Sequence, residues 1–249
     1  MAGMVGTRVQ PASAGAASGN IVPVSVKLDP SSGTPSSIGH EDVLDAGMFG
    51  SGDFEMYDPA GRATAVSDNG TACDIVANSG GGELSSSAGQ FQNPWIRYKH
   101  ALMGDVEIIA QITSSGGNAL KQFGLIVGSG DTSTEGGNVT YRFGRASATL
   151  GQRVLYSIGN SSAKAVTVAS NVDYADRWCR LKIVANEIEA YDGGTGSSPS
   201  WTKVAGPKKW DRAGGHRYAG VIWRAGANDD KVGIKYFELI GTRYVADPE

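Results

Sequence analysis

The chain has 249 residues, a formal net charge of −3 and 36 glycines. A chain of this length suits one large β domain with an appendage, and glycine at this density without a collagen repeat indicates many turns. The near-neutral charge gives no bulk attraction to phosphate or anionic lipid, so we expect neither a nucleic acid nor a membrane as partner. We find no apolar run near the ~18 residues that span a bilayer and no signal peptide, so we expect synthesis in a cytoplasm.

The cysteines and histidines do not form a metal-binding pattern. Cys73 and Cys179 are far apart in the sequence, and His40, His100 and His216 are scattered. A structural zinc site needs clustered ligands at short spacings, so we expect none. We predict two buried free thiols, although the sequence alone leaves a disulfide between them open.

The first 45 residues differ in composition from the rest of the chain, because glycine, alanine, serine and proline dominate them. Only the run from Ile21 to Leu28 alternates apolar and polar residues, and Pro23 confines that run to a sheet edge or an extended arm. Residues 1–45 are either a disordered tail or an arm that adds a strand to a neighbouring subunit. The arm residues that would make this contact are Ile21, Val22, Val24, Val26 and Leu28.

Residues 46–249 follow a period of two and contain about ten short strand candidates bounded by turn residues, as in a sandwich or barrel. In Asp105–Thr113 and Trp178–Ala185 the alternation is clean, which indicates antiparallel strands with one solvated face. Trp178, Arg180 and Lys182 are expected to face outward. The residues expected to face the core are Val106, Ile108, Ala110, Ile112, Cys179, Leu181, Ile183, Ile188 and Ala190.

Several segments follow one another in a recognisable order. These include Gly104–Ala110, Phe123–Val127, Asp176–Ile183, Glu189–Gly194 and Val232–Ile240. Over roughly residues 46–242 the chain resembles the concanavalin A-like lectin/glucanase jelly rolls, including laminin-G-like modules. The resemblance implies two stacked antiparallel sheets, often with a calcium ion and a glycan-binding concave face. That fold hosts lectins, hydrolases, adhesion modules and virion proteins, so it does not fix the function.

Catalytic motifs are weak in this sequence. Glycoside hydrolysis needs two carboxylates about 5–10 Å apart, and the best local pair is Glu187 with Glu189. These residues flank Ile188 beside a glycine-rich turn and lack the E-x-D-x-x-E spacing of the family's hydrolases, so we interpret them as a solvated strand face. No Gly-x-Ser-x-Gly motif is present either. We therefore expect no enzymatic activity.

Two loops could hold a cation. Calcium prefers carboxylates and carbonyls clustered on loops, although neither loop has EF-hand spacing and both also fit ordinary polar turns. We expect no obligatory cofactor, with calcium as the one ion these loops could bind. The first loop contains Asp131 near Glu135 and Asn138, and the second contains Asn228, Asp229 and Asp230.

Aromatic residues beside arginines are the candidate ligand-binding residues. An exposed aromatic ring with a neighbouring guanidinium suits a sugar or another polar ligand, although packing in the sheet is the alternative for each ring. The candidates are Trp223, Arg142, Trp178 and Arg180.

Together these features favour a non-enzymatic structural protein of a bacteriophage virion, such as a capsid decoration, head-fibre or tail component. It would be made in the host cytoplasm, anchor by its N-terminal arm to other virion subunits, form a homo-oligomer and present a glycan-binding face. The first alternative is a lectin-like carbohydrate-binding module or adhesin. The second is a glycoside hydrolase of the same fold.

Overall fold

The fold is all-β, as the alternation predicts. The structure, a computed structural model, describes residues 20–28, 54–57, 63–68, 73–77, 95–115, 122–128, 139–145, 150–156, 164–170, 176–209, 217–224 and 231–245. These segments are strands and their connections, and none of them is helical. Within them there is accordingly no helix with the length and apolarity to cross a membrane.

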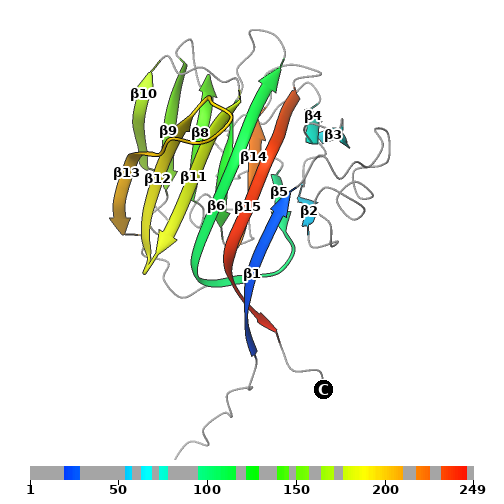
Figure 1. Cartoon of the computed structure of the whole chain (residues 1–249), viewed down its shortest axis with the longest axis vertical. Helices are drawn as coiled ribbons and strands as arrows, with labels where there is room; N and C mark the ends of the chain where they lie inside the picture. Colours follow the sequence, from blue (N-terminus) through cyan, green and yellow to red (C-terminus); the bar gives the residue numbers. More distant parts are fainter. Residues whose placement is uncertain are drawn as a thin grey trace, which may run out of the picture.

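Two antiparallel sheets stack on each other as a jelly-roll sandwich (Figure 1). The front sheet in Figure 1, which we name sheet A, has the strand order β13-β12-β11-β6-β15-β4-β3, and β1 also pairs with β15. Its strands are β1 (Asn20–Leu28), β3 (Ala63–Asp68), β4 (Cys73–Ala77), β6 (Leu102–Ser115), β11 (Arg177–Val184), β12 (Glu187–Gly194), β13 (Thr202–Lys209) and β15 (Lys231–Val245).

The rear sheet, sheet B, has the order β10-β9-β8-β7-β14-β5-β2. Its strands are β2 (Phe54–Tyr57), β5 (Trp95–Tyr98), β7 (Gln122–Gly128), β8 (Val139–Arg145), β9 (Leu150–Tyr156), β10 (Lys164–Ser170) and β14 (Tyr218–Arg224). All described pairings in both sheets are antiparallel, so hairpins and crossovers between the layers connect the strands.

The core lies between the two sheets and has the composition that the alternation predicts. Val106, Ile108, Ala110 and Ile112 of β6 are at most 1% exposed. The other inward-facing predictions in β11 and β12, from Cys179 to Ala190, are also buried. Alternate residues of a strand point to opposite faces, so burial of this set leaves the intervening residues on the outer face of sheet A.

Cys179 is a buried free thiol that donates a hydrogen bond to the carbonyl of Ala110 at 3.5 Å. Burial raises the pKa of this thiol far above its ordinary value, because the thiolate would lose its hydration. The prediction of a free buried thiol is confirmed for Cys179. The side chain of Cys73 lies outside the described residues.

The arm residues join the sandwich of their own chain. β1 pairs with β15 from Asn20 opposite Val245 to Leu28 opposite Phe237. Val24 is 5% exposed and packs in the core, whereas Ile21 is 67% exposed. In this structure the strand is therefore added to sheet A of its own chain and lies within the predicted 1–45 arm, and contact of the arm with a neighbouring subunit stays a prediction. An edge position tolerates Pro23, which has no N–H to donate.

Arg217 connects the two sheets at the end of the sandwich where β6 and β14 begin. Its backbone exchanges hydrogen bonds of 2.7 and 3.0 Å with Leu102, and its Nη2 donates to Asn186 Oδ1 at 2.7 Å. The residue is 3% exposed, and burial lowers the pKa of its guanidinium while Asp105 opposes that shift. Arg217 directly precedes β14 of sheet B and bonds to Leu102 and Gly104 of β6 in sheet A, so it helps to hold the two sheets in their relative position.

Candidate functional site

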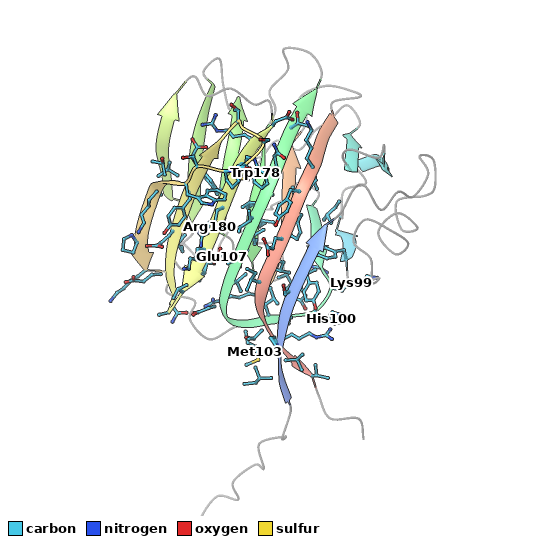
Figure 2. All side chains as sticks on the ribbon, viewed as in Figure 1. Lys99, His100, Met103, Glu107, Trp178 and Arg180 are labelled. Atoms are coloured by element: carbon cyan, nitrogen blue, oxygen red, sulfur yellow. The ribbon has the colours of Figure 1, made fainter. Side chains whose placement is uncertain are left out.

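The outer face of sheet A carries rows of polar and aromatic residues (Figure 2). The strand register defines these rows, because residues opposite one another on adjacent strands share a face. One row contains Lys203, Tyr191, Arg180, Ile109 and Glu238. The next row contains Glu189, Lys182, Glu107 and Ile240.

Arg180 lies at the centre of this surface. Its Nη2 is 2.7 Å from Glu107 Oε1, and its guanidinium carbon lies 5.0 Å from the ring centroid of Tyr191 and 5.9 Å from that of Trp201. The side chains of Arg180 and Glu107 are 22% and 18% exposed, so the pair reaches solvent but cannot move freely. We name these four residues (Glu107, Arg180, Tyr191 and Trp201) the Arg180 cluster.

Glu189 extends the cluster toward β13. Tyr191 Oη donates to Glu189 Oε2 at 2.6 Å, and Lys203 Nζ lies 2.5 Å from Glu189 Oε1. The hydrogen bond from Lys203 and then that from Tyr191 lower the pKa of the Glu189 carboxyl group. Glu189 is therefore an ionised acceptor at neutral pH. A glycosidase general acid needs the opposite shift, whereas a general base stays ionised.

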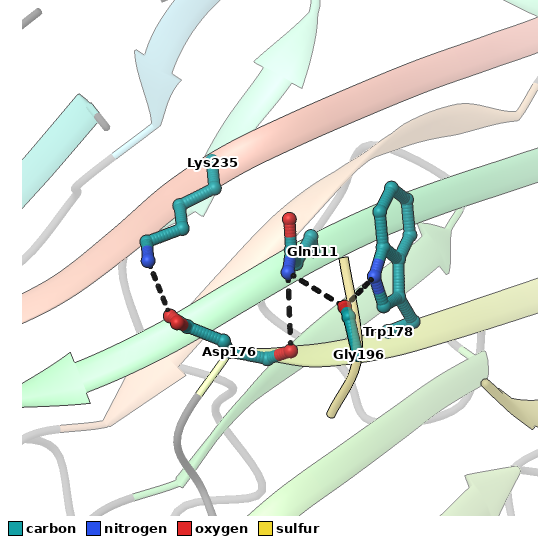
Figure 3. A network of polar contacts seen from close by, with 5 residues as sticks. All are labelled: Gln111, Asp176, Trp178, Gly196 and Lys235. Carbon is teal, nitrogen blue, oxygen red and sulfur yellow. Dashed lines mark hydrogen bonds and ion pairs between the residues drawn. The ribbon is translucent and has the colours of Figure 1, made fainter. Parts of the chain in front are cut away.

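Trp178 lies beneath the connection between β12 and β13 (Figure 3). Its Nε1 donates to the carbonyl of Gly196 at 2.8 Å, and Gln111 Nε2 donates to the same carbonyl at 3.4 Å. Gln111 also donates to Asp176 O at 3.3 Å, and Lys235 pairs with Asp176 Oδ1 at 2.7 Å. The ring of Trp178 packs against Tyr236 at 5.1 Å between centroids.

Trp178 is consequently only 7% exposed. It has the outward position that the alternation predicts, but the expectation that it forms a ligand platform is wrong. Residues 193–200 fold back over the indole, with Gly194 in the left-handed region at φ 75°. Gly193 is required by close packing, since a Cβ there would lie 2.6 Å from Trp178 Cβ.

The other predicted ligand residues are in sheet B. Arg142 is opposite Gly124 in the pairing of β8 with β7, and Trp223 is opposite Phe123 in the pairing of β14 with β7. These two positions therefore lie on the layer opposite Arg180, with β7 between them. Their side chains lie outside the described residues, so their role in binding stays a prediction.

The predicted cation loops cannot be compared with the structure. Asp131, Asn228, Asp229 and Asp230 all lie outside the described residues. Across the segments that are described, no group of three or more histidine, cysteine, aspartate or glutamate side chains could hold a metal ion. Calcium binding stays a prediction from the sequence.

One outward position in the middle of sheet B is closed to solvent. Ile126 is fully buried, yet it alternates with Leu125 and Val127, which belong to the core cluster. It therefore points away from the core and is still shielded from solvent. Among the side chains of sheet B that the structure describes, Arg97 lies 4.8 Å from the ring centroid of Tyr218 and forms a comparable arginine–tyrosine pair. The Arg180 cluster is thus the best-defined candidate site.

Sequence reasoning selected Arg180 but missed Glu107, Tyr191 and Trp201 as site residues. Alternation does place Glu107 and Tyr191 on outward positions, and this is the feature of the sequence that could have identified them as site residues. Their proximity to Arg180 depends on the order of β12, β11 and β6 in the sheet, and a single sequence does not contain that order.

Comparison with known proteins shows the fold. No family model matches the sequence, and no curated protein matches it. A functionally unknown protein from Saccharomyces cerevisiae has a TM-score of 0.53 at 10% identity, covering 79% of this chain and 98% of that chain. A mutant of the GH43 protein BlXynB from Bacillus licheniformis has a TM-score of 0.54 at 12% identity, covering 86% of this chain but 39% of that one. A legume lectin-like domain from Entamoeba histolytica has a TM-score of 0.49 at 10% identity, covering 75% and 89%.

The two stacked antiparallel sheets confirm the jelly-roll class, and the first two of these structures share the fold. They also correct one expectation. We expected a protein without enzymatic activity, but the GH43 protein, 39% of whose chain is covered, shares the fold, so the exclusion of an enzyme is withdrawn. The weak local carboxylate motif was the reason for that expectation, and a sandwich can assemble a site from distant strands. The virion role receives no support from these structures and stays a prediction.

Proposed function

We propose that this chain recognises a carbohydrate on the outer face of sheet A, with the Arg180 cluster at the centre of the binding surface. The observation that carries this proposal is the position of one guanidinium against both Tyr191 and Trp201, with Glu107 bonded to it. Sugar rings pack their C–H faces on aromatic rings, while their hydroxyl groups hydrogen-bond to charged side chains. The cluster offers both kinds of contact within one small area.

The position of the cluster supports this function. Glu107, Arg180 and Tyr191 lie on β6, β11 and β12, and Trp201 directly precedes β13, so regular strands hold three of the four residues. Side chains held by strands and by mutual ion pairs keep their geometry without a ligand, which lowers the entropic cost of binding. The partial exposure of the Arg180–Glu107 pair leaves it within reach of a ligand from solvent.

The test is a glycan array with a matched pair of variants. Tyr191→Ala removes a ring that contacts Arg180, whereas Tyr218→Ala removes the ring of the comparable Arg97–Tyr218 pair on sheet B. We expect Tyr191→Ala and Trp201→Ala to lose the glycans that the unmodified protein binds, and Tyr218→Ala to retain them. Loss in the Tyr218 variant alone, or no glycan binding by the unmodified protein, would overturn the proposal.

Glycoside hydrolysis is the second candidate, and one observation favours it. Glu189 and Glu107 lie on either side of Lys182 in the same row, two strand spacings apart. Two spacings separate the backbones of these residues by about 9.6 Å, just above the carboxyl separation of about 6.5–9.5 Å in inverting glycosidases, so side chains that lean toward each other would reach that range. The lowered pKa of Glu189 suits the general base of such a pair. Hydrolysis would be supported if the unmodified protein releases reducing sugar from a glycan and both Glu107→Gln and Glu189→Gln do not. If the protein binds a glycan but releases no reducing sugar, carbohydrate recognition is the remaining function.

A further inference from the structure

We infer that the outer face of sheet A takes a neutral glycan, one without carboxylate or sulfate groups. This inference rests on the proposed function and adds the chemical class of the ligand. It comes from the distribution of charge around the Arg180 cluster, where Arg180, Lys203 and Lys235 are each paired with a carboxylate and Lys182 lies between two.

Three of these cations have a carboxylate partner at bonding distance. Arg180 pairs with Glu107 at 2.7 Å, Lys203 pairs with Glu189 at 2.5 Å, and Lys235 pairs with Asp176 at 2.7 Å. None of these pairs is fully exposed, since the most open side chain, that of Lys203, is 43% exposed. An anionic ligand would have to compete with these carboxylates, which belong to the same chain and therefore stay close to the cations.

The remaining lysine of the central rows lies between two carboxylates. Lys182 is opposite Glu189 on β12 and opposite Glu107 on β6. Glu238 adds a further negative charge on β15, where its Oε2 accepts a hydrogen bond from Tyr236 Oη at 2.7 Å. The charges of these rows therefore balance, with glutamates on both sides of the Arg180 cluster.

This arrangement disfavours acidic sugars and suits neutral ones. A uronate or sulfate placed over Tyr191 and Trp201 would lie close to Glu107 and Glu189, and like charges brought together while water is excluded cost free energy. A neutral sugar presents hydroxyl donors, and carboxylate oxygens are strong acceptors for them. The aromatic rings contribute contact area that does not depend on charge.

The experiment is calorimetric titration of the full-length protein with defined oligosaccharides. Xylohexaose and cellohexaose are the neutral probes, and hexagalacturonate and a heparin hexasaccharide are the acidic ones. We expect binding of at least one neutral probe with little dependence on sodium chloride, and no binding of either acidic probe. A steep salt dependence would indicate binding through unpaired cations instead.

Two variants test the cause of the selectivity. Glu107→Gln leaves Arg180 without its carboxylate, and Glu238→Gln removes a negative charge from β15 without touching the Arg180 pair. We expect Glu107→Gln to acquire measurable binding to hexagalacturonate, and Glu238→Gln to do so more weakly. Glu55→Gln makes the same change of charge on β2 of sheet B and should leave the selectivity unchanged. Far-UV circular dichroism confirms that each variant folds.

The outcomes separate this inference from the proposed function. If hexagalacturonate or heparin binds and the neutral probes do not, the ligand class is wrong while carbohydrate recognition stands. If none of the four probes binds and the glycan array is also blank, both proposals are overturned. If acidic probes still fail to bind Glu107→Gln and Glu238→Gln, the carboxylates are not the cause of selectivity and the charge argument is wrong.

Discussion

The indole of Trp178 donates its Nε1–H to the carbonyl of Gly196 at 2.8 Å. This hydrogen bond joins a residue of β11 to the connection between β12 and β13 on the outer face of sheet A. Gln111 of β6 donates to the same carbonyl at 3.4 Å. This connection leads into Trp201, one ring of the Arg180 cluster. The hydrogen bond therefore helps to position the candidate site, although Trp178 itself is too buried to contact a ligand.

Removing this hydrogen bond should destabilise the fold modestly. Trp178→Phe keeps an aromatic ring but loses the donor, leaving the Gly196 carbonyl with only Gln111 as a described donor. We expect the free energy of unfolding to fall by about 1 kcal/mol or somewhat more, since a smaller ring is also introduced. Urea unfolding measures this change, with Trp201→Phe as the control for loss of an indole elsewhere on the face. If Trp178→Phe and Trp201→Phe lose the same amount of unfolding free energy, the hydrogen bond to Gly196 has no specific role in stability.

Gly193 should tolerate no side chain. An added Cβ would lie 2.6 Å from Trp178 Cβ and 2.9 Å from Pro199 Cβ, so the backbone would have to shift. We expect Gly193→Ala to destabilise the protein by about 1–3 kcal/mol. At Gly241 the nearest atom would be Leu102 Cδ2 at 3.4 Å, an ordinary contact. Gly241→Ala is therefore the control, and thermal unfolding curves that shift equally for both variants would show the packing argument to be wrong.

The Lys203–Glu189 contact should make stability depend on pH. The pKa of Glu189 is lowered in the folded protein, so its contribution to stability is fully present above the unfolded value of about 4.3 and is lost as pH falls through the folded pKa. Lys203→Gln removes the main cause of that shift. We expect the difference in unfolding free energy between the two proteins to shrink as pH falls below the usual glutamate range.

Denaturant unfolding across that pH range is the measurement. Lys209→Gln serves as the control, because Lys209 is an exposed lysine at the other end of β13. Its effect on stability should not follow the ionisation of Glu189. If the difference in unfolding free energy between the unmodified protein and Lys203→Gln stays constant down to acidic pH, Lys203 does not act on stability through the ionisation of Glu189.

Arg217 should not be replaceable by lysine. The guanidinium donates from Nη2 to Asn186 and from Nη1 to the Gly104 carbonyl, and one ammonium group cannot reach both acceptors with the same geometry. Hydrogen bonds of a charged donor contribute about 1.5–3 kcal/mol each, so we expect Arg217→Lys to lower the unfolding free energy by about 2–3 kcal/mol. Chemical denaturation tests this against Arg243→Lys, a half-buried position on β15. Similar small effects at both positions would argue against a special role for Arg217.

The alternation of single strands could be predicted from the sequence. Val106, Ile108, Ala110 and Ile112 are buried as expected, because a strand packed on one side must place its apolar residues at every second position. The same rule correctly places Arg180 and Lys182 on the outer face. Many such strands separated by turns predict a sandwich or barrel, the resemblance implies a jelly roll, and the jelly-roll class is confirmed.

Relations between distant segments could not be predicted in the same way. The partner of β1 is β15, more than 200 residues away in the sequence, and no local pattern specifies it. The burial of Trp178 depends on residues 193–200 folding back over it, which the outward position alone does not reveal. The Arg180 cluster likewise requires that β11 lie between β6 and β12.

The most direct test of carbohydrate recognition on sheet A is a titration of ¹⁵N-labelled protein with xylohexaose or cellohexaose, followed by amide and indole N–H resonances. We predict that the shifts gather at Arg180, Tyr191 and Trp201, including the indole N–H of Trp201. Residues Arg97 and Tyr218 on sheet B should not respond. Shifts confined to sheet B, or no shifts with any glycan that the array identifies, would contradict the account.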